Sequence, residues 1–330
     1  MTISLILTGG TICSRTAADG LRRCDVPAVS TVLEQRFRAQ HPENPVQFAV
    51  QAPLNRLSED LTPADWLKLL DCIAETDLTG TDGMMILHGT DTLHQTAAML
   101  SAALAGVPVP VVLVSACSPP GEPDSNADAN FAAAVSLIQQ GLQPGVWAVY
   151  RNTDGKVWLH RGCELEECSR SADFHSPHMC PAEHAPTGPR GDARLLSRRD
   201  RFQNAAEILL LMPYNGMRYD RIPLNQTAAV LHATYHSGTA NSSEASPYSV
   251  CELLRRCKEA GTPCYLAPCV LQAGSYSSTA ALVQQGAIPL DMPLWFAYSA
   301  LWLGALCGLK GDSLTKFVTD TYQRVRYQPE

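Results

Sequence analysis

Residues 87–97 read Leu-His-Gly-Thr-Asp-Thr-Leu-His-Gln-Thr-Ala, and this stretch decides the fold. The apolar run Met84 to Leu87 leads into it and is typical of a short buried strand. A glycine ends the run, a threonine and an aspartate follow, and a helical pattern begins. A hydroxyl and a carboxylate are therefore predicted at the carboxyl end of a strand, where open α/β sheets bind their ligands.

A second stretch near the N-terminus has the same design. Residues 3–7 form an apolar run, and Thr8-Gly9-Gly10-Thr11-Ile12 follows it. The two glycines permit a tight turn and the close approach of a ligand to the backbone. Either stretch alone is a weak signal, because a threonine or aspartate before a helix is more often an N-cap than a catalytic group. Together, about 80 residues apart, the two are a strong signal.

The composition argues against several classes of protein. A length of 330 residues suits two domains or one large one, and 45% hydrophobic with 17% charged residues is typical of a globular protein. The net charge of −7 disfavours a nucleic-acid surface. We see neither a signal peptide nor an apolar run close to the ~20 residues of a membrane span. We therefore expect a cytoplasmic protein that binds neither nucleic acid nor a membrane.

The twelve cysteines do not have the pattern of a disulfide framework. Several lie in apolar segments, where a free thiol behaves as a small hydrophobic group. Cys163 and Cys168 could form a metal site with His160 and His175, but their spacing matches no standard zinc pattern. We expect reduced cysteines, no metal ion and no cofactor.

The first half of the chain alternates apolar strands with helical patterns. The predicted strands are 3–7, 46–50, 84–87, 109–114 and 146–150, and the predicted helices are 63–74, 93–104 and 131–140. Thr62 is the expected N-cap of the first of these helices, with Pro63 at its first position. Such alternation predicts an open, mostly parallel sheet with helices on both faces.

Four prolines between residues 175 and 194 indicate an interdomain linker. Beyond them we predict strands 208–212, 229–231 and 264–268 and helices 250–260, 294–306 and 314–325, with Gly261 as a C-cap. The fold class is therefore two-domain α/β. A larger N-terminal domain covers residues 1–185, a linker 186–205, and a smaller C-terminal α/β domain 206–330.

The two motifs resemble the signatures of the bacterial-type L-asparaginases, which hydrolyse a side-chain amide with threonine nucleophiles. Residues 55–66 resemble the substrate-clasping segment of that family and the helix after it. Residues 112–119 resemble the strand and turn that close the pocket. The resemblance covers essentially the whole chain and is most specific over roughly residues 3–120. It implies the same two-domain layout, with the N-terminal domain as the catalytic one.

The resemblance implies catalytic roles for three residues. Thr11 matches the primary nucleophile, which must be activated because a hydroxyl is a poor nucleophile at neutral pH. Thr90 matches the threonine that activates water or the substrate amide, and Asp91 the carboxylate that holds the substrate ammonium. Backbone N–H groups near Gly10 and Thr90 would donate to the oxyanion. The alternative for Thr11 is a cap of the following segment.

Five further residues are implied in substrate binding. Ser58 matches the hydroxyl that grips the substrate α-carboxylate, and Glu59 falls where relatives bind the α-amino group. Both types are also ordinary loop residues before a helix, so function and structure are about equally good explanations. Gly10, Gly89 and Ala116 complete the predicted set.

Two departures from the family pattern affect the expected activity. The loop 12–33 has no tyrosine to orient the first threonine. When residues 159–162 are aligned with the corresponding strand and turn, Glu167 stands where the family has a catalytic lysine. Lys156 lies several residues too early and fits a solvated turn. Glu167 beside Asp91 would form a like-charge pair, with the substrate ammonium as a shared counter-ion.

The leading hypothesis is an asparaginase-like amidohydrolase that acts on a small amide, asparagine first, through an acyl-enzyme on Thr11. The alternative is a catalytically degenerate paralogue that binds an amino acid or derivative without hydrolysing it. A third possibility, the asparaginase-like subunit of a tRNA amidotransferase, ranks low because the chain starts at the first motif strand. We also expect a homodimer or homotetramer. Residues 293–296 are apolar surface candidates, and residues 235–241 resemble a loop that completes a neighbouring subunit's pocket.

Overall fold

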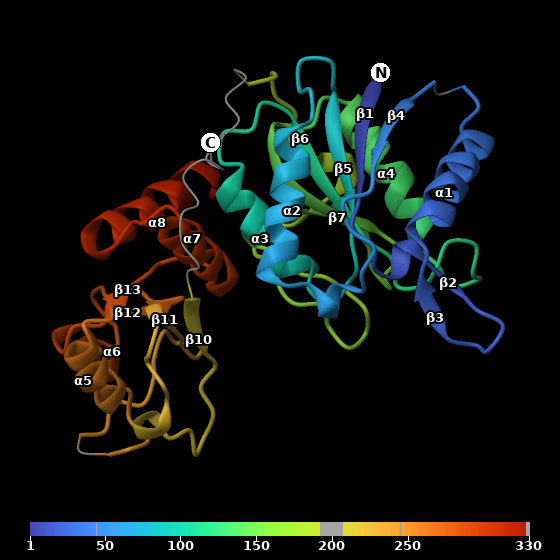
Figure 1. Ribbon diagram of the computed structural model, residues 1–330. Coiled ribbons are helices and arrows are strands. Elements are labelled where there is room, and N and C mark those ends of the chain that lie inside the picture. Colours follow the sequence, from blue (N-terminus) through green and yellow to red (C-terminus); the bar gives the residue numbers. More distant parts are fainter. Residues whose placement is uncertain (44, 192–206, 245, 328–330) are drawn as a thin grey trace. The chain divides into compact units, whose positions relative to one another are not determined.

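A computed structural model describes residues 1–43, 45–191, 207–244 and 246–327 (Figure 1). The chain divides into two compact units, Met1–Ser197 with Val325–Glu330, and Arg198–Arg324. Each unit contains its own parallel sheet and helices, so the predicted α/β fold class is confirmed. Of the predicted linker, residues 192–205 lie outside the described residues, and Pro186 accepts a hydrogen bond from Gln143 within the first unit.

The first unit is built on a seven-stranded sheet in the order β4-β1-β5-β6-β7-β8-β9. Its strands are β1 (Thr2–Leu7), β4 (Gln47–Gln51), β5 (Gly83–Leu87), β6 (Pro110–Val114), β7 (Gly145–Arg151), β8 (Val157–Arg161) and β9 (Cys180–Pro181). The five strands from β4 to β7 are parallel, whereas β8 and β9 pair antiparallel. The predicted mostly parallel sheet is confirmed.

Helices cover both faces of this sheet (Figure 1). They are α1 (Val26–Gln40), α2 (Pro63–Ala74), α3 (Leu93–Ala103) and α4 (Ala127–Gln139). Alternate strand residues such as Leu5 and Met85 share one core with α1 and α4. The intervening residues Ile6 and Ile86 are equally buried, because α2 and α3 cover the other face. The indole N–H of Trp66 on α2 donates to a hydroxyl of α3 at 3.1 Å.

Two helix predictions for the first unit were wrong in part. Residues 26–33 were assigned to a loop but begin α1, whose buried residues Val26, Val29, Leu33 and Phe37 have helical spacing. Helix α4 starts at Ala127, four residues before the predicted Phe131, because its first turn is small and polar rather than apolar. Helix α2 starts as predicted. Thr62 forms a reciprocal capping box with Asp65 at its N-terminus.

The second unit has a four-stranded parallel sheet in the order β10-β11-β12-β13. Its strands are β10 (Glu207–Leu211), β11 (Thr227–Ala233), β12 (Cys264–Ala267) and β13 (Ile288–Pro289). Its helices are α5 (Val250–Ala260), α6 (Ser277–Gln284), α7 (Leu294–Leu306) and α8 (Gly311–Val325). The predicted strands and helices are all present, and β13 and α6 were not predicted. Gly261 is the left-handed C-cap of α5, as expected.

One predicted surface group in the second unit is not at the surface. Phe296 is fully buried on α7, with its ring 5.1 Å from that of Tyr322 on α8. Residues 293–295 are half-buried. The expectation that residues 293–296 form an exposed apolar surface was therefore wrong for Phe296, because α8 packs against it. In the described part of the chain, every helix is too short or too polar to cross a membrane.

Candidate active site

The sheet places both sequence motifs at one edge. Strands β1 and β5 are neighbours, with Leu7 in register with Leu87. Just past them, the N–H and the hydroxyl of Thr8 both donate to the carbonyl of Leu87, at 3.0 and 2.8 Å. The chain then turns through Gly9 and Gly10 on one side and through residues 88–89 on the other. The turns that carry Thr11 and Thr90 therefore leave adjacent strands at the same end.

Glycine is required where these turns meet. Gly10 has a φ of +75°, and a Cβ at this position would lie 2.1 Å from the Cα of Gly89. A Cβ on Gly89 would lie 2.5 Å from the hydroxyl oxygen of Ser58. A Cβ on Gly9 would overlap the carbonyl of Arg56. We had expected these glycines to admit a ligand, but the space beside them is filled by protein.

The segment that carries Ser58 is held against both turns. The N–H of Arg56 donates to Thr8, and the N–H of Gly10 donates back to the carbonyl of Arg56 at 2.8 Å. Ser58 then begins a short 3₁₀ turn, Ser58–Asp60, and is buried. The hydroxyl of Thr92 donates to the Ser58 carbonyl at 2.8 Å. Ser58 therefore lies beside the two motifs, whereas its neighbour Glu59 is exposed.

Neither Thr11 nor Asp91 acts as a helix cap. Thr11 opens the 3₁₀ turn η1 (Thr11–Cys13), whose N-cap is Gly10, and no side chain caps this turn. The N-cap of α3 is Thr92, again without a side-chain capping bond. Thr11 and Thr90 are half-buried and Asp91 is exposed. The capping explanation weighed for Thr11 therefore fails, and all three side chains can be reached from solvent.

His88 stiffens the second turn in its neutral form. Its imidazole is fully buried, and burial lowers its pKa to about 4. Its Nδ1 lies 2.8 Å from the carbonyl oxygen of Gly89, an acceptor, so Nδ1 carries the proton. The ring therefore donates to the backbone next to Thr90 and remains uncharged at neutral pH.

The residue nearest in effect to Asp91 on the following segment is a cysteine. Burial raises the pKa of the Cys168 thiol to about 11, and the negative charge of Asp91 adds to this rise. The adjacent Glu167 is exposed and contributes less. Lys156 stacks over Trp158 in the β7–β8 turn, with Nζ 5.9 Å from the ring centroid. Within the described ranges, no lysine or arginine forms an ion pair with Asp91.

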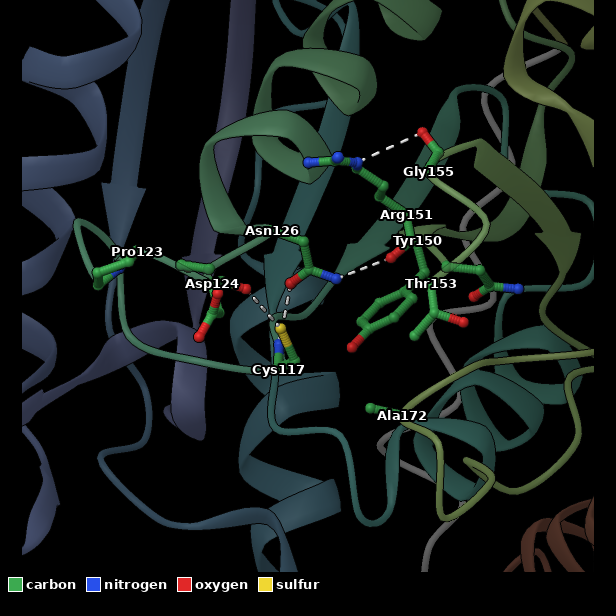
Figure 2. Close-up of a pocket in the computed structure, with 11 residues that line it drawn as sticks. Cys117, Pro123, Asp124, Asn126, Tyr150, Arg151, Thr153, Gly155 and Ala172 are labelled. Atoms are coloured by element: carbon green, nitrogen blue, oxygen red, sulfur yellow. Dashed lines mark hydrogen bonds between the residues drawn. The ribbon is translucent and has the colours of Figure 1, made fainter.

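A pocket of about 300 Å³ opens at the carboxyl ends of β6 and β7 (Figure 2). Residues 117–126, which follow Ala116, form one wall, and residues 150–155 with Ala172 form the other. The Tyr150 hydroxyl points toward the space between Cys117 and Ala172 (Figure 2). Burial raises the pKa of Tyr150, and a nearby amide of Asn126 lowers it less. Its hydroxyl has no well-aligned hydrogen-bond partner in the described structure.

Asn126 fixes the loop that forms this pocket. Its side-chain oxygen accepts from the N–H of Cys117, and its side-chain nitrogen donates to the carbonyl of Arg151, each at 2.9 Å (Figure 2). Asn130 makes a parallel pair of bonds, to the carbonyl of Ser115 and from the N–H of Arg151. The loop after β6 is therefore anchored to β7. Sequence reasoning missed both asparagines, although their place after a strand end is a signal for such bonds.

The loop expected after Thr11 is instead a hairpin followed by helix α1. Strands β2 (Ser14–Thr16) and β3 (Arg22–Cys24) pair antiparallel. The hydroxyl of Ser14 donates to the carbonyl of Gly10 at 2.8 Å, so the hairpin starts directly against the first motif.

The cysteine and histidine residues considered for a metal site do not converge. The ring of His160 is buried against the Ser176 hydroxyl at 3.0 Å, while the Cys163 thiol bonds to a backbone carbonyl. Across the described residues, no three histidine, cysteine or acidic side chains are arranged to hold a metal ion. In the second unit, the loop 235–241 is closed by bonds between Tyr235 and residues 238–239.

These features define a two-unit α/β protein with two threonine-bearing turns at one sheet edge. The model of the N-terminal asparaginase domain matches residues 2–189, which is more than half of the chain. The chain therefore belongs to the asparaginase family, and the resemblance drawn from the sequence is confirmed.

Solved structures share the fold over nearly the whole chain. An L-asparaginase from Thermococcus kodakarensis is 20% identical with a TM-score of 0.73, covering 97% of both chains. L-asparaginase I from Vibrio cholerae is 22% identical with a TM-score of 0.74, covering 98% of this chain and 97% of that one. A probable cytoplasmic L-asparaginase from Campylobacter jejuni is 19% identical with a TM-score of 0.68, covering 97% of this chain and 98% of that one. Such low identity shows the fold alone.

Curated relatives have a different name, since they are subunits of glutamyl-tRNA(Gln) amidotransferases. The relative from Methanobrevibacter smithii is 31% identical over 196 residues, or 54% of this chain and 41% of the relative. The relative from Thermoplasma acidophilum is 33% identical over 184 residues, or 54% of this chain and 43% of the relative. The match spans about two fifths of the length of these relatives.

Proposed function

We propose that this chain is an amidohydrolase that hydrolyses a small side-chain amide to the acid and ammonia, with Thr11 as nucleophile and asparagine as first candidate substrate. The observation that carries the proposal is the contact between Gly10 and Gly89, which brings two uncapped threonine turns to one sheet edge. Membership of the asparaginase family supports the class of reaction. The substrate itself is part of the proposal.

The proposed reaction proceeds in two steps. The hydroxyl oxygen of Thr11 bonds to the amide carbon, and its proton passes by way of Thr90 to the leaving nitrogen. The C–N bond breaks, and ammonia departs. Water then cleaves the ester on Thr11, which gives the acid and restores the hydroxyl. The N–H of Gly10 is already committed to Arg56, so the N–H groups of Thr11 and Thr90 are the proposed oxyanion donors.

Substrate binding is proposed to use the groups around this edge. Asp91 is exposed and makes no ion pair with the rest of the described chain, so its carboxylate is available for an ammonium group. The hydroxyl of Ser58 beside Gly89 is placed for a carboxylate. Ala116 lies buried at the end of β6. Glu59 is a weaker candidate because it is exposed on the 3₁₀ turn.

A second candidate function has its own support. The curated relatives are named as amidotransferase subunits, which favours a chain that releases ammonia for a partner. The degenerate alternative, binding without hydrolysis, is favoured by the acidic and thiol side chains where the family has a lysine. The three differ in product and in partner, so one set of experiments separates them.

The test is ammonia release from asparagine, glutamine and small peptide and lactam amides. We expect turnover of at least one amide by the wild-type protein and its loss in Thr11→Ala, with Thr31→Ala as the matched control. Thr31 is an exposed threonine of α1, so its removal should leave the rate unchanged. No turnover of any amide, with ligand-induced thermal stabilisation, would favour the degenerate binder. Copurification of a partner and ammonia transfer to it would favour the amidotransferase role.

A further inference from the structure

The hairpin β2–β3 is tied to the loop after β6 by a single carboxylate. One oxygen of Glu122 accepts from the hydroxyl of Thr16 on β2 at 2.6 Å. Its other oxygen accepts from the guanidinium of Arg22 on β3 at 2.9 Å. Both strands of the hairpin are therefore fixed by one side chain about 100 residues further along the chain.

The loop that carries Glu122 is itself rigidly held. The guanidinium of Arg22 continues to the hydroxyl of Ser118 at 3.1 Å and the carbonyl of Cys117 at 3.5 Å. The carbonyl of Ser118 accepts from the Ser125 hydroxyl, and Cys117 is fixed by Asn126. The hairpin is thus attached to the wall of the pocket in Figure 2.

The hairpin is also continuous with the proposed nucleophile. Only two residues separate Thr11 from Ser14, the first residue of β2. The other end of the hairpin returns to the same turn, because the N–H of Asp25 donates to the carbonyl of Cys13 at 2.8 Å. Movement of the hairpin would therefore be transmitted to Thr11 from both sides.

We infer that Glu122 is a positioning residue, which holds the hairpin β2–β3 against the loop 117–126 and so keeps Thr11 and the substrate in place. This inference rests on the proposed function for its effect on catalysis. The side chains of Arg22 and Glu122 are 47% and 30% exposed. Such a pair is weak and is screened by salt, so the hairpin opens readily and its opening depends on ionic strength.

The test compares Glu122→Gln with a matched control, Asp128→Asn. Asp128 pairs with Arg36 in the same unit, with side chains of similar exposure, 26% and 39%, but far from the hairpin in its contacts. Tryptic cleavage after Arg22 and Arg23 reports hairpin opening and leaves the cleaved sequence intact. We expect cleavage to be about threefold or more faster in Glu122→Gln and unchanged in Asp128→Asn. High salt should bring the wild-type rate toward that of Glu122→Gln.

Kinetics then separate positioning from a purely structural role. Glu122→Gln should raise KM by about threefold or more with a smaller change in kcat, because the reacting groups are unchanged and only the closed population falls. The double variant Arg22→Glu, Glu122→Arg should recover protection relative to Glu122→Arg alone. Equal cleavage in wild type, Glu122→Gln and Asp128→Asn would overturn the inference. Faster cleavage with unchanged KM would also overturn the positioning role. The cleavage result does not depend on activity, so it stands apart from the proposed function.

Discussion

At the scale of single residues, the site depends on the absence of a side chain at Gly10. Two glycines, Gly10 and Gly20, both have positive φ, at +75° and +80°. An added Cβ would meet nothing within 4 Å at Gly20 but would overlap the backbone of Gly89 at Gly10. The two positions therefore share backbone strain and differ in packing.

Replacing each glycine by alanine separates these effects. Both variants should lose about 1 kcal/mol from backbone strain. Gly10→Ala should lower Tm further and abolish amide hydrolysis, because the turns must separate. Thermal unfolding and ammonia release are the measurements. If Gly10→Ala were as stable and as active as Gly20→Ala, the contact between the two turns would not be needed for the site.

Position 167 offers a second test at this scale. A lysine there would supply the positive charge that the family places beside the aspartate. We expect Glu167→Lys to raise asparagine hydrolysis by about tenfold or more, since general-base contributions are typically ~100- to 10,000-fold and placement is imperfect. Glu166→Lys is the matched control, because it makes the same charge change on the exposed neighbouring residue. Equal rates in the two variants would mean that net charge, not a base at position 167, is responsible.

At the scale of elements, local signals predicted some boundaries to the residue. Helix α2 begins at its capping box, and α5 runs from a Ser249 cap to Gly261. These signals lie within three residues of the boundary and act through local hydrogen bonds. The apolar spacing of α1 was also readable but was obscured by the expectation of a loop. The antiparallel strands β8 and β9 have no comparable local signal, because strand direction depends on pairing partners far along the chain.

The candidate site divides in the same way. Thr11, Thr90, Asp91 and Ser58 stand in recognisable motifs, and the structure brings their turns together. The approach of Cys168 to Asp91 and the bonds of Glu122 follow no sequence spacing. They depend on loop conformations that no periodicity describes. The site residues proposed from the sequence remain predictions until they are tested by substitution.

Buried histidines make the elements of this fold sensitive to acid. Burial lowers the pKa of His88 and His232 to about 4 and that of His160 to about 3, against about 6.5 when unfolded. Between these values the unfolded chain binds more protons, so the free energy of unfolding falls as the pH drops below 6.5. Each histidine should cost about 1–2 kcal/mol at pH 5.5, since one pKa unit is worth about 1.4 kcal/mol.

Urea unfolding at pH 7.5, 6.5 and 5.5 measures this effect. We expect the free energy of unfolding to be highest at pH 7.5 and lowest at pH 5.5. The decrease should be smaller in His160→Gln, which removes one of the titrating groups. A free energy that is constant or rises as the pH falls over this range would contradict the assignment of neutral buried histidines.

At the scale of the whole molecule, the second unit exposes apolar side chains at one end of its sheet. They follow the carboxyl ends of β10, β11 and β12 and the loop before α6, and comprise Met212, Tyr214, Tyr235, Val270, Leu271 and Tyr276. Contiguous apolar surface of this kind is typical of an interface. We propose that it contributes to a homodimer or homotetramer with two-fold interfaces.

Light scattering at micromolar concentration tests this assembly. The wild-type protein should have the mass of a dimer or tetramer, and Leu271→Lys should shift the mass toward the monomer. Val32→Lys is the control, because it places the same charge on an exposed valine of α1 in the other unit. A monomeric wild-type protein would contradict the proposed assembly.

The most direct test of the account is to look for the acyl-enzyme. Protein mixed with asparagine, quenched in acid and digested should yield a peptide around Thr11 that carries an added aspartyl group. Hydroxylamine should release this group, and Thr11→Ala should never acquire it. Turnover of asparagine by Thr11→Ala at the wild-type rate, or an adduct on another residue, would contradict the central claim that Thr11 is the nucleophile.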